Sequence, residues 1–352
     1  MLAQALLRVF EICPVLALLA PNLHLCLSRF AVFETDDAGD GHLAIAEKLL
    51  VSGGMGVGLT TGRSAFVEGA QRAGRRFIPQ PYELYSEENH AAWRRLYAGM
   101  ESRWVRHANA PFLRGLEALR LDPDRVPRLE DVNRFLAPLT GFQAVGVSGY
   151  LPTFLFFDCL RRRKFPTTIT MRDVAQSFSP WPDIFHDITG HVPMHTDPAF
   201  ADVLVQFGQC AHTAIELVSG VTDEEEKVRR LTSMIRAMAR FFWFTVETGL
   251  MRGPGGVKVY GSALLSSRSE IDRATDPARV QRYPIQLEWV VNQGFLPNFY
   301  QPLLFIVDSF DHLFSLVEEF ETWMRQGKLD DVAPGEPEIS APDVASFLGS
   351  ML

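Results

Sequence analysis

This 352-residue chain has few cysteines and no long block of charges of one sign. Its four cysteines (Cys13, Cys26, Cys159 and Cys210) have neither the spacing of a disulfide framework nor that of a zinc site, which predicts reduced thiols in a cytoplasmic protein. The 34 basic and 42 acidic residues are dispersed and give a formal net charge of −8. This charge distribution provides no electrostatic basis for binding nucleic acid.

The N-terminal region also lacks the features of a membrane anchor or a signal peptide. Its uncharged stretch from Ile12 to Ser28 is interrupted by Pro14 and Pro21 and is shorter than the roughly 20 apolar residues that a membrane span requires. A net basic cluster and a convincing small-residue cleavage site are missing. We therefore predict no membrane partner and interpret residues 1–76 as an accessory region or linker, or in part as translated sequence upstream of the true start.

Helical periodicity is the main feature that the sequence does have. Apolar residues form one stripe over residues 87–107, behind Ser86 and two glutamates, which predicts a capped helix. Further helices are expected over residues 110–119, 129–136, 222–249 and 308–326. Short strands are expected over residues 257–263 and 303–309, and residues 142–150 form a strand or a loop. The predicted fold is mostly α with a small antiparallel β-sheet.

Two histidines and one glutamate are the candidate metal ligands. His186 and His191 lie in WPDIFHDITGHVPMH, and Glu247 lies in FFWFTVETGL, more than fifty residues later. Two imidazoles and one carboxylate give a non-haem ferrous ion one occupied face and one face open to oxygen. A zinc protease instead places its two histidines four residues apart with a glutamate between them. A zinc hydrolase, or a metal-binding protein without redox activity, is therefore the weaker alternative.

The five-residue spacing of the histidines constrains the local backbone. Around an ideal α-helix this step rotates the second ring by about 140° from the first, so one straight helix cannot present both. Gly190 and Pro193 flank the second histidine. We expect them to kink or end the helix there and to turn His191 back toward His186.

Glu247 lies in an apolar segment that predicts a buried helix. Four aromatic residues, 241–244, and Val246 precede it. A lone buried carboxylate must pair with a cation, stay protonated or bind a metal. We favour a metal, because the two histidines need the same explanation. The alternative is that Glu247 pairs with a nearby arginine such as Arg240 and that the histidines are ordinary core residues.

The chain resembles the aromatic amino acid hydroxylases, and most closely the short bacterial phenylalanine hydroxylases, from about Phe77 to Trp323. The resemblance lies in several separate blocks, among them SGYLPTFLFFDCL, KFPTTITMR, PDIFHDITGHVPMHTDPAFAD, FWFTVETGL and VYGSALLSS. It implies the catalytic-domain fold of that family over residues 77–327, followed by a Pro-rich tail over residues 328–352.

The resemblance also implies the chemistry. A protein similar to these hydroxylases binds Fe(II) through His186, His191 and Glu247 and uses dioxygen and a tetrahydropterin to hydroxylate the ring of an aromatic L-amino acid. The expected reaction converts L-phenylalanine to L-tyrosine. The alternatives with the same chemistry are 5-hydroxylation of tryptophan and 3-hydroxylation of phenylalanine. The expected protein is a cytoplasmic monomer or small homo-oligomer.

Residue by residue, the resemblance assigns two further sets of positions. The expected pterin-binding residues are Gly149, Tyr150, Leu151, Phe156 and Asp187. The expected substrate-binding residues are Arg172, Pro180, Asp183, Trp243 and Ser266. Arg172 would hold the amino acid carboxylate as a bidentate fork, Asp183 would orient it, and Ser266 would hydrogen-bond the first iron histidine.

Some positions match less directly. Tyr260 and Glu270 are further matches, and Tyr260 is equally typical of a half-buried strand aromatic. The chain departs from the family pattern at Trp181 and Arg268. Because one pocket residue changes discrimination between substrates by only about 1–3 kcal/mol, these departures leave the ring and the position of hydroxylation open.

Overall fold

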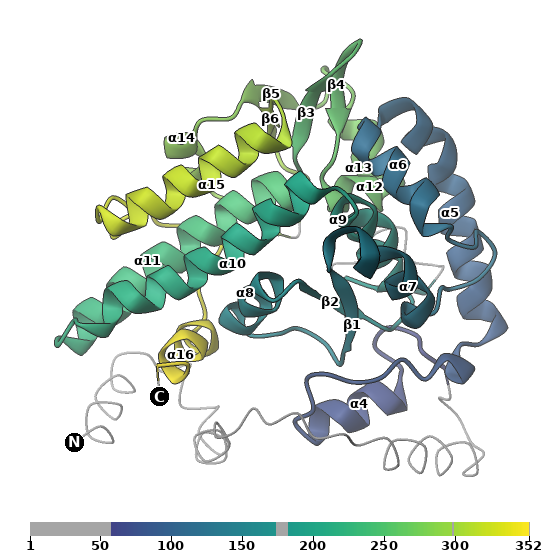
Figure 1. The fold of residues 1–352 in the computed structure, drawn as a ribbon, viewed down its shortest axis with the longest axis horizontal. Helices are drawn as coiled ribbons and strands as arrows, with labels where there is room; N and C mark the ends of the chain where they lie inside the picture. Colours follow the sequence, from purple (N-terminus) through teal and green to yellow (C-terminus); the bar gives the residue numbers. More distant parts are fainter. Residues whose placement is uncertain (1–57, 174–181, 298, 352) are drawn as a thin grey trace. The chain divides into compact units, whose positions relative to one another are not determined.

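The computed structural model describes residues 58–173, 182–297 and 299–351, and helices account for most of them (Figure 1). In chain order the helical elements are α4 (Ala65–Arg72), η2 (Tyr82–Leu84), α5 (Glu87–His107), α6 (Ala110–Leu119), α7 (Leu129–Thr140), α8 (Thr153–Arg161), η3 (His186–His191), α9 (Val192–His195), α10 (Pro198–Ser219), α11 (Glu224–Phe242), η4 (Trp243–Glu247), α12 (Ser262–Leu265), α13 (Arg268–Ala274), α14 (Leu287–Asn292), α15 (Phe310–Arg325) and α16 (Ala341–Gly349).

Two small sheets lie among these helices. In the first, β1 (Gln143–Val147) pairs in parallel with β2 (Lys164–Thr168), because α8 forms the crossover that returns the chain in the same direction. The second has the order β4-β3-β6-β5, from β3 (Leu250–Gly253), β4 (Gly256–Val259), β5 (Gln281–Pro284) and β6 (Leu303–Val307).

The strand pairing corrects one sequence prediction. The mostly helical fold with small sheets is confirmed, but among the described strands β3 and β4 pair antiparallel, while the β1–β2, β3–β6 and β5–β6 pairs are parallel. β3 and β4 are joined by a tight turn, whereas helices separate the partners of each parallel pair: α12, α13 and α14 lie between β3 and β6, and α14 lies between β5 and β6. The length of each connection therefore determined the strand direction.

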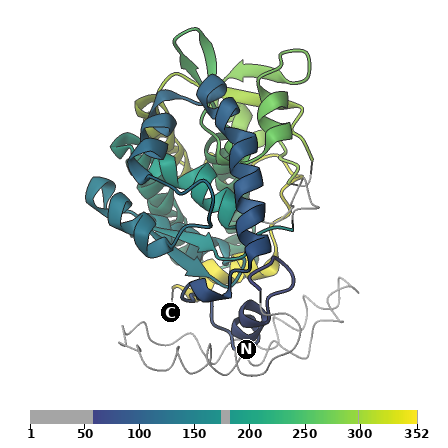
Figure 2. The same cartoon turned by 90° about the vertical axis from the view of Figure 1, so that its right-hand side faces the viewer.

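The predicted capped helix is confirmed as α5, which runs along the side of the domain that faces the viewer in Figure 2. The side chain of Ser86 accepts a hydrogen bond from the backbone N–H of Asn89, and the side-chain oxygen of Asn89 accepts one from the backbone N–H of Ser86. The apolar stripe is buried against the core, with Trp93 and Trp104 at 0% and 1% exposure. These large buried rings fix α5 to the rest of the domain.

A helical layer of α10, α11 and α15 forms another part of the core (Figure 1). α10 packs against α8, α11 and α15, with Phe207 of α10 in edge contact with Phe241 and Phe242 of α11. Asp223 caps α11 as the acidic start of that segment predicts, and Gly327 ends α15 with a positive φ of 74°. No helix of the described ranges is long and apolar enough to span a membrane.

The C-terminal tail contains a helix that the sequence reasoning missed. α16 begins after Ser340, which caps it, and it buries Val344 and Phe347. Pro342 lies in its first turn, where a missing N–H costs nothing. The Pro-rich composition is therefore compatible with a helix. The domain boundaries at residues 76 and 327 stay predictions.

Candidate active site

The two candidate histidines lie in a π-helical segment, η3, that continues directly into α9. Hydrogen bonds in a π-helix span five residues instead of four, so residues five apart come onto one face. The Nε2 atoms of His186 and His191 are 3.1 Å apart. The expected approach of His191 to His186 is therefore present, but the helix does not end at Gly190 or Pro193: a widened turn brings the rings together, and Pro193 lies in the first turn of α9.

Gly190 allows two segments of the site to pack closely. A Cβ atom at this position would lie 2.6 Å from the backbone oxygen of Ser262, at the start of α12. The missing side chain lets η3 and α12 approach closely. This approach matters because α12 and the residue after it carry two serines that contact the candidate metal ligands.

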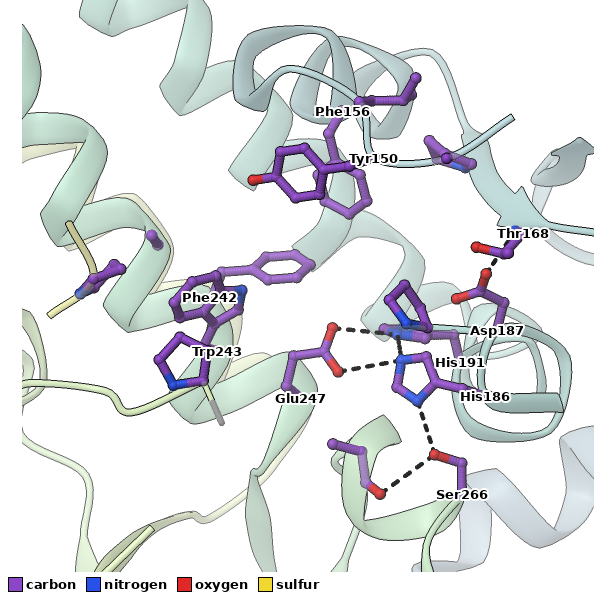
Figure 3. Close-up of a pocket in the computed structure, with 18 of the residues that line it drawn as sticks. Tyr150, Phe156, Thr168, His186, Asp187, His191, Phe242, Trp243, Glu247 and Ser266 are labelled. Carbon is purple, nitrogen blue, oxygen red and sulfur yellow. Dashed lines mark hydrogen bonds and ion pairs between the residues drawn. The ribbon is translucent and has the colours of Figure 1, made fainter. Parts of the chain in front are cut away.

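Glu247 ends a second π-helical segment, η4, which continues α11. Its Oε1 lies 3.3 Å from Nε2 of His191 and its Oε2 lies 3.6 Å from Nε2 of His186 (Figure 3). Ser262 donates a hydrogen bond of 2.6 Å to Oε2. Arg240 instead donates to backbone carbonyls. Glu247 therefore belongs with the two histidines rather than in an ion pair with Arg240.

The protonation states fit a metal centre. Burial disfavours the charged form of Glu247, but the adjacent His191 and His186 and the bond from Ser262 lower its pKa to about 2. Burial lowers the pKa of His186 to about 4. At neutral pH the site thus holds a carboxylate and a neutral His186, the forms that bind metal. Two imidazole nitrogens and a carboxylate within 3.6 Å fit one mononuclear ion.

Asp187 is a competing carboxylate, since one of its oxygens lies within 4.8 Å of the histidine nitrogens. Its Oδ2, however, accepts a hydrogen bond of 2.6 Å from the backbone N–H of Thr168. Burial raises the pKa of Asp187 to about 7, so the charged form is disfavoured there. Glu247 lies closer to both Nε2 atoms and is the better third ligand.

Ser266 and Ser262 hydrogen-bond two of the candidate ligands, His186 and Glu247. The Ser266 Oγ lies 2.8 Å from Nδ1 of His186 and donates a bond of 2.9 Å to the backbone oxygen of Ser262. Because the serine proton is used in that bond, the serine oxygen accepts a hydrogen bond from Nδ1–H of His186, and Nε2 is left free for a metal. The sequence reasoning missed Ser262. Its spacing of four residues from Ser266, one helical turn, is the signal that places both on one face.

Arg172 and Asp183 form a buried, two-pronged ion pair. Nε of Arg172 donates to Oδ2 of Asp183 at 2.8 Å, and Nη2 donates to Oδ1 at 2.6 Å. Asp183 is fully buried and also accepts the backbone N–H groups of Arg172 and His186. Burial opposes its charge, but Arg172 keeps its pKa below the usual range. The salt bridge expected from the sequence is present, and it ties Arg172 to the first residue of η3.

These groups face one cavity of about 950 Å³. Of the pterin- and substrate-binding residues predicted from the sequence, those that line it are Gly149, Tyr150, Leu151, Phe156, Arg172, Asp187, Trp243 and Ser266. Tyr150 and Phe156 lie across the cavity from the histidines and Glu247 (Figure 3). Asp183 lies behind Arg172 rather than in the lining. The predicted Pro180, and Trp181 beside it, lie outside the described residues.

The remaining sequence matches separate into two groups. Glu270 lines the cavity, where burial and the charge of Glu247 raise its pKa to about 7. Tyr260 is buried and packs edge-on against Phe310, away from the cavity lining. Arg268 packs on α5 at Gly99: a Cβ atom added to Gly99 would lie only 2.8 Å from Cδ of Arg268. The departure at Arg268 thus falls on a helix contact, which leaves the described part of the cavity unchanged.

The fold and the two-histidine, one-carboxylate arrangement define a class, the non-haem mononuclear metal enzymes with open coordination positions. Residues 64–328 match the family of biopterin-dependent aromatic amino acid hydroxylases, and the chain belongs to this family. It is 37% identical to the phenylalanine-4-hydroxylase of Chromobacterium violaceum over 76% of this chain and 84% of that protein. The family expected from the sequence is thereby confirmed.

Two further comparisons bear on the site. A crystal structure of the Chromobacterium violaceum phenylalanine hydroxylase with bound oxidised Fe(III) matches with a TM-score of 0.65 and 33% identity, over 75% of this chain and 91% of that one. The tyrosine 3-monooxygenase of Bos taurus is 36% identical over 66% of this chain and 45% of that protein. Membership of a hydroxylase family removes the zinc hydrolase alternative.

Proposed function

We propose that this enzyme hydroxylates L-phenylalanine to L-tyrosine with Fe(II), dioxygen and a tetrahydropterin. The observation that carries the proposal is the convergence of His186, His191 and Glu247 with Arg172 and the loop at Tyr150 on one cavity. Relatives named phenylalanine-4-hydroxylase, at 37% and 35% identity, support this substrate over other aromatic amino acids.

In this proposal His186, His191 and Glu247 would hold the iron from one side of the cavity. The iron and the pterin, when bound, would supply the electrons for the reaction with dioxygen. The hydroxyl oxygen of Ser266 accepts a hydrogen bond from Nδ1–H of His186 and so fixes the tautomer whose Nε2 would face the metal. Ser262 holds Oε2 of Glu247, so the carboxylate keeps its orientation toward both histidines.

Arg172 is the proposed partner of the amino acid carboxylate. Its bonds to Asp183 use Nε and Nη2, and they hold the guanidinium plane in place without using Nη1. A guanidinium is suited to a carboxylate because it stays charged and donates several parallel hydrogen bonds. Trp243, which packs against Phe295 with ring centroids 5.1 Å apart, and Pro180 would contact the substrate ring.

The pterin would occupy the end of the cavity near Gly149, Tyr150 and Leu151. Phe156 is the proposed stacking partner of its ring. Phe242 meets Phe156 edge-on with centroids 5.6 Å apart and so limits how that ring can turn. Asp187, held by the backbone of β2, would lie near the pterin at the metal side.

A panel of aromatic amino acids with product identification tests the proposal. The purified chain, loaded with ferrous iron under anaerobic conditions and given a tetrahydropterin and oxygen, should yield tyrosine from phenylalanine as its main product. A main product of 3-hydroxyphenylalanine or 5-hydroxytryptophan would select the alternative target with the same chemistry. The absence of any hydroxylated amino acid would reject the proposed activity.

We also propose a cytoplasmic enzyme that acts as a monomer or small homo-oligomer, with a catalytic domain over residues 77–327 and an accessory region over residues 1–76. Cys159 and Cys210 are free and buried, which is compatible with a reducing compartment. The proposed partners are the amino acid, dioxygen and the pterin, with no nucleic acid or membrane. Light scattering after size-exclusion chromatography measures the oligomeric state.

A further inference from the structure

Helix α8 begins without a capping side chain of its own. Its N-cap residue is Pro152, which offers no hydrogen-bond acceptor on its side chain. The first N–H groups of a helix have no partner inside the helix, and they need acceptors from elsewhere. This helix start is important because α8 directly follows the proposed pterin loop and carries Phe156.

The acceptors come from α16, almost two hundred residues later in the chain. Asp343 accepts the backbone N–H of Thr153 at 3.3 Å and also the hydroxyl of Thr153 through the same Oδ1. The Oγ of Ser346 accepts the backbone N–H of Phe154 at 3.2 Å. A carboxylate at a helix N-terminus is also favoured by the helix dipole. α16 therefore caps α8 from outside (Figure 1).

Packing strengthens this contact. The rings of Phe154 and Phe347 meet edge-on with centroids 5.2 Å apart, and Phe347 is fully buried. Ser340 donates a hydrogen bond to Oδ2 of Asp343, so both carboxylate oxygens are engaged. The two helices are thus held together by charge, hydrogen bonds and apolar contact at a single junction.

The segment that leads into α16 is anchored separately, by the buried Arg240 of α11. Its guanidinium donates to the backbone oxygens of Ala333 at 2.8 Å, Pro334 at 3.2 Å and Glu336 at 2.9 Å. Arg236, one turn earlier, donates to the backbone oxygen of Pro337 at 3.4 Å. Two arginines of α11, the helix that leads to Glu247, therefore fix the path of the tail.

This anchored tail also forms part of the cavity wall. Pro337, Glu338, Ile339 and Asp343 line the same cavity as Tyr150 and the metal ligands. The tail thus touches the proposed pterin end twice: directly, through these residues, and indirectly, through the start of α8.

We propose that the C-terminal segment, residues 333–349, is a positioning element of the pterin site, in which Asp343 and Ser346 fix the start of α8 and hence the loop at Tyr150 and the ring of Phe156. This inference rests on the proposed placement of the pterin. It assigns a role in pterin affinity to a part of the chain beyond residue 328, where the family match ends.

The test compares Asp343→Ala, Asp343→Asn and Ser346→Ala with the wild-type chain. Binding of 7,8-dihydrobiopterin, which does not support turnover, is measured by titration calorimetry on protein loaded with Co(II). The Michaelis constant for the tetrahydropterin and the turnover number are measured in parallel on the iron-loaded enzyme. The affinity for Co(II), measured on each variant, shows whether the substitution disturbs the candidate metal ligands.

Asp343→Ala should weaken pterin binding and raise the Michaelis constant for the pterin about tenfold, the equivalent of one lost charged hydrogen bond. Turnover at saturating pterin and Co(II) affinity should change less than about twofold. Ser346→Ala should show a smaller effect in the same direction. Asp343→Asn keeps an acceptor oxygen and should restore most of the affinity.

Asp223→Ala is the matched control, because Asp223 caps α11 in the same way but does not line the cavity. It should lower the melting temperature by a similar amount and leave pterin binding unchanged. Equal pterin affinity in Asp343→Ala and the wild type would overturn the proposed role of the C-terminal segment. So would a loss of pterin affinity in Asp223→Ala as large as that in Asp343→Ala. Neither result would contradict the proposed hydroxylase function. A wild-type chain that binds no dihydrobiopterin would contradict the proposed function as well.

Discussion

The two ends of the cavity are held in different ways. At the metal end, His191 has a side-chain exposure of 3%, and the ligands lie in π-helical turns braced by serines from one neighbouring segment. At the proposed pterin end, Tyr150 is 74% exposed, and α8 depends on acceptors from the distant α16. The metal end is thus preorganised by buried contacts, whereas the proposed pterin end is more exposed and depends on acceptors from the C-terminal segment.

Removing a metal ligand should have the largest effect. Within the described ranges, Glu247 is the only carboxylate within 4 Å of both Nε2 atoms, so we expect Glu247→Ala to lose iron binding and turnover together. Metal analysis of the purified variant after iron loading provides the measurement. Glu338→Ala, at the tail side of the same cavity, is the control and should keep its iron. A Glu247→Ala protein that retains iron would argue that Asp187 is the third ligand.

Breaking the buried ion pair should have the next largest effect. Arg172→Ala leaves Asp183 charged, fully buried and unpaired, which we expect to lower the free energy of unfolding by about 3–5 kcal/mol. Urea denaturation measures the loss. Arg172→Lys keeps a cation but loses the planar fork, so its fold should survive while the Michaelis constant for the amino acid rises. An unchanged Michaelis constant in Arg172→Lys would argue against the proposed carboxylate contact.

Removing the bracing serine should have an intermediate effect at the metal end. Ser266→Ala deletes the partner of His186 Nδ1, and we expect metal affinity to fall about 10- to 100-fold. Competition with a chelator of known affinity measures the change. The adjacent Ser267→Ala removes a hydroxyl that lies 3.4 Å from the hydroxyl of Ser269, and this variant should bind metal normally. Equal affinities in the two variants would show that the serine does not orient the ligand.

The smallest predicted effect concerns pH and the far end of α8. Burial of Asp158 opposes its charge, but bonds from His212 and Arg161 lower its pKa to about 2. A lowered pKa contributes stability that is complete above the unfolded value near 3.9 and is lost as the pH falls toward 2. We expect about 1 kcal/mol, after allowance for solvent screening. Unfolding curves between pH 5 and pH 2 should show this slope in the wild type and less of it in Asp158→Asn.

The sequence predicted the elements whose signals are local. The Ser86 cap and apolar stripe of α5, and the acidic start of α11, are read directly from neighbouring residues. The candidate ligands were also proposed from the sequence, since a buried carboxylate and two nearby histidines are costly without a metal; the structure brings the three side chains together. The π-helical turns were not predicted, because their five-residue hydrogen bonds leave no compositional mark that separates them from an α-helix.

Contacts between distant segments were the other part that the sequence did not reveal. Parallel pairing in the sheets depends on how helical crossovers pack, and the cap of α8 by Asp343 joins residues 190 positions apart. Arg240 was considered as a partner of Glu247, yet its guanidinium donates hydrogen bonds to backbone carbonyls of the C-terminal tail. Each of these depends on tertiary packing, which overrides local preference.

The proposed iron site can be examined in a crystal structure of the chain grown with Fe(II) under anaerobic conditions. We expect one iron ion, located by anomalous scattering, within about 2.0–2.2 Å of Nε2 of His186, Nε2 of His191 and a carboxylate oxygen of Glu247, in the range typical of such ligands. The cavity side of the ion should be open to the loop at Tyr150. Iron bound by Asp187 in place of Glu247, or found elsewhere in the chain, would contradict it.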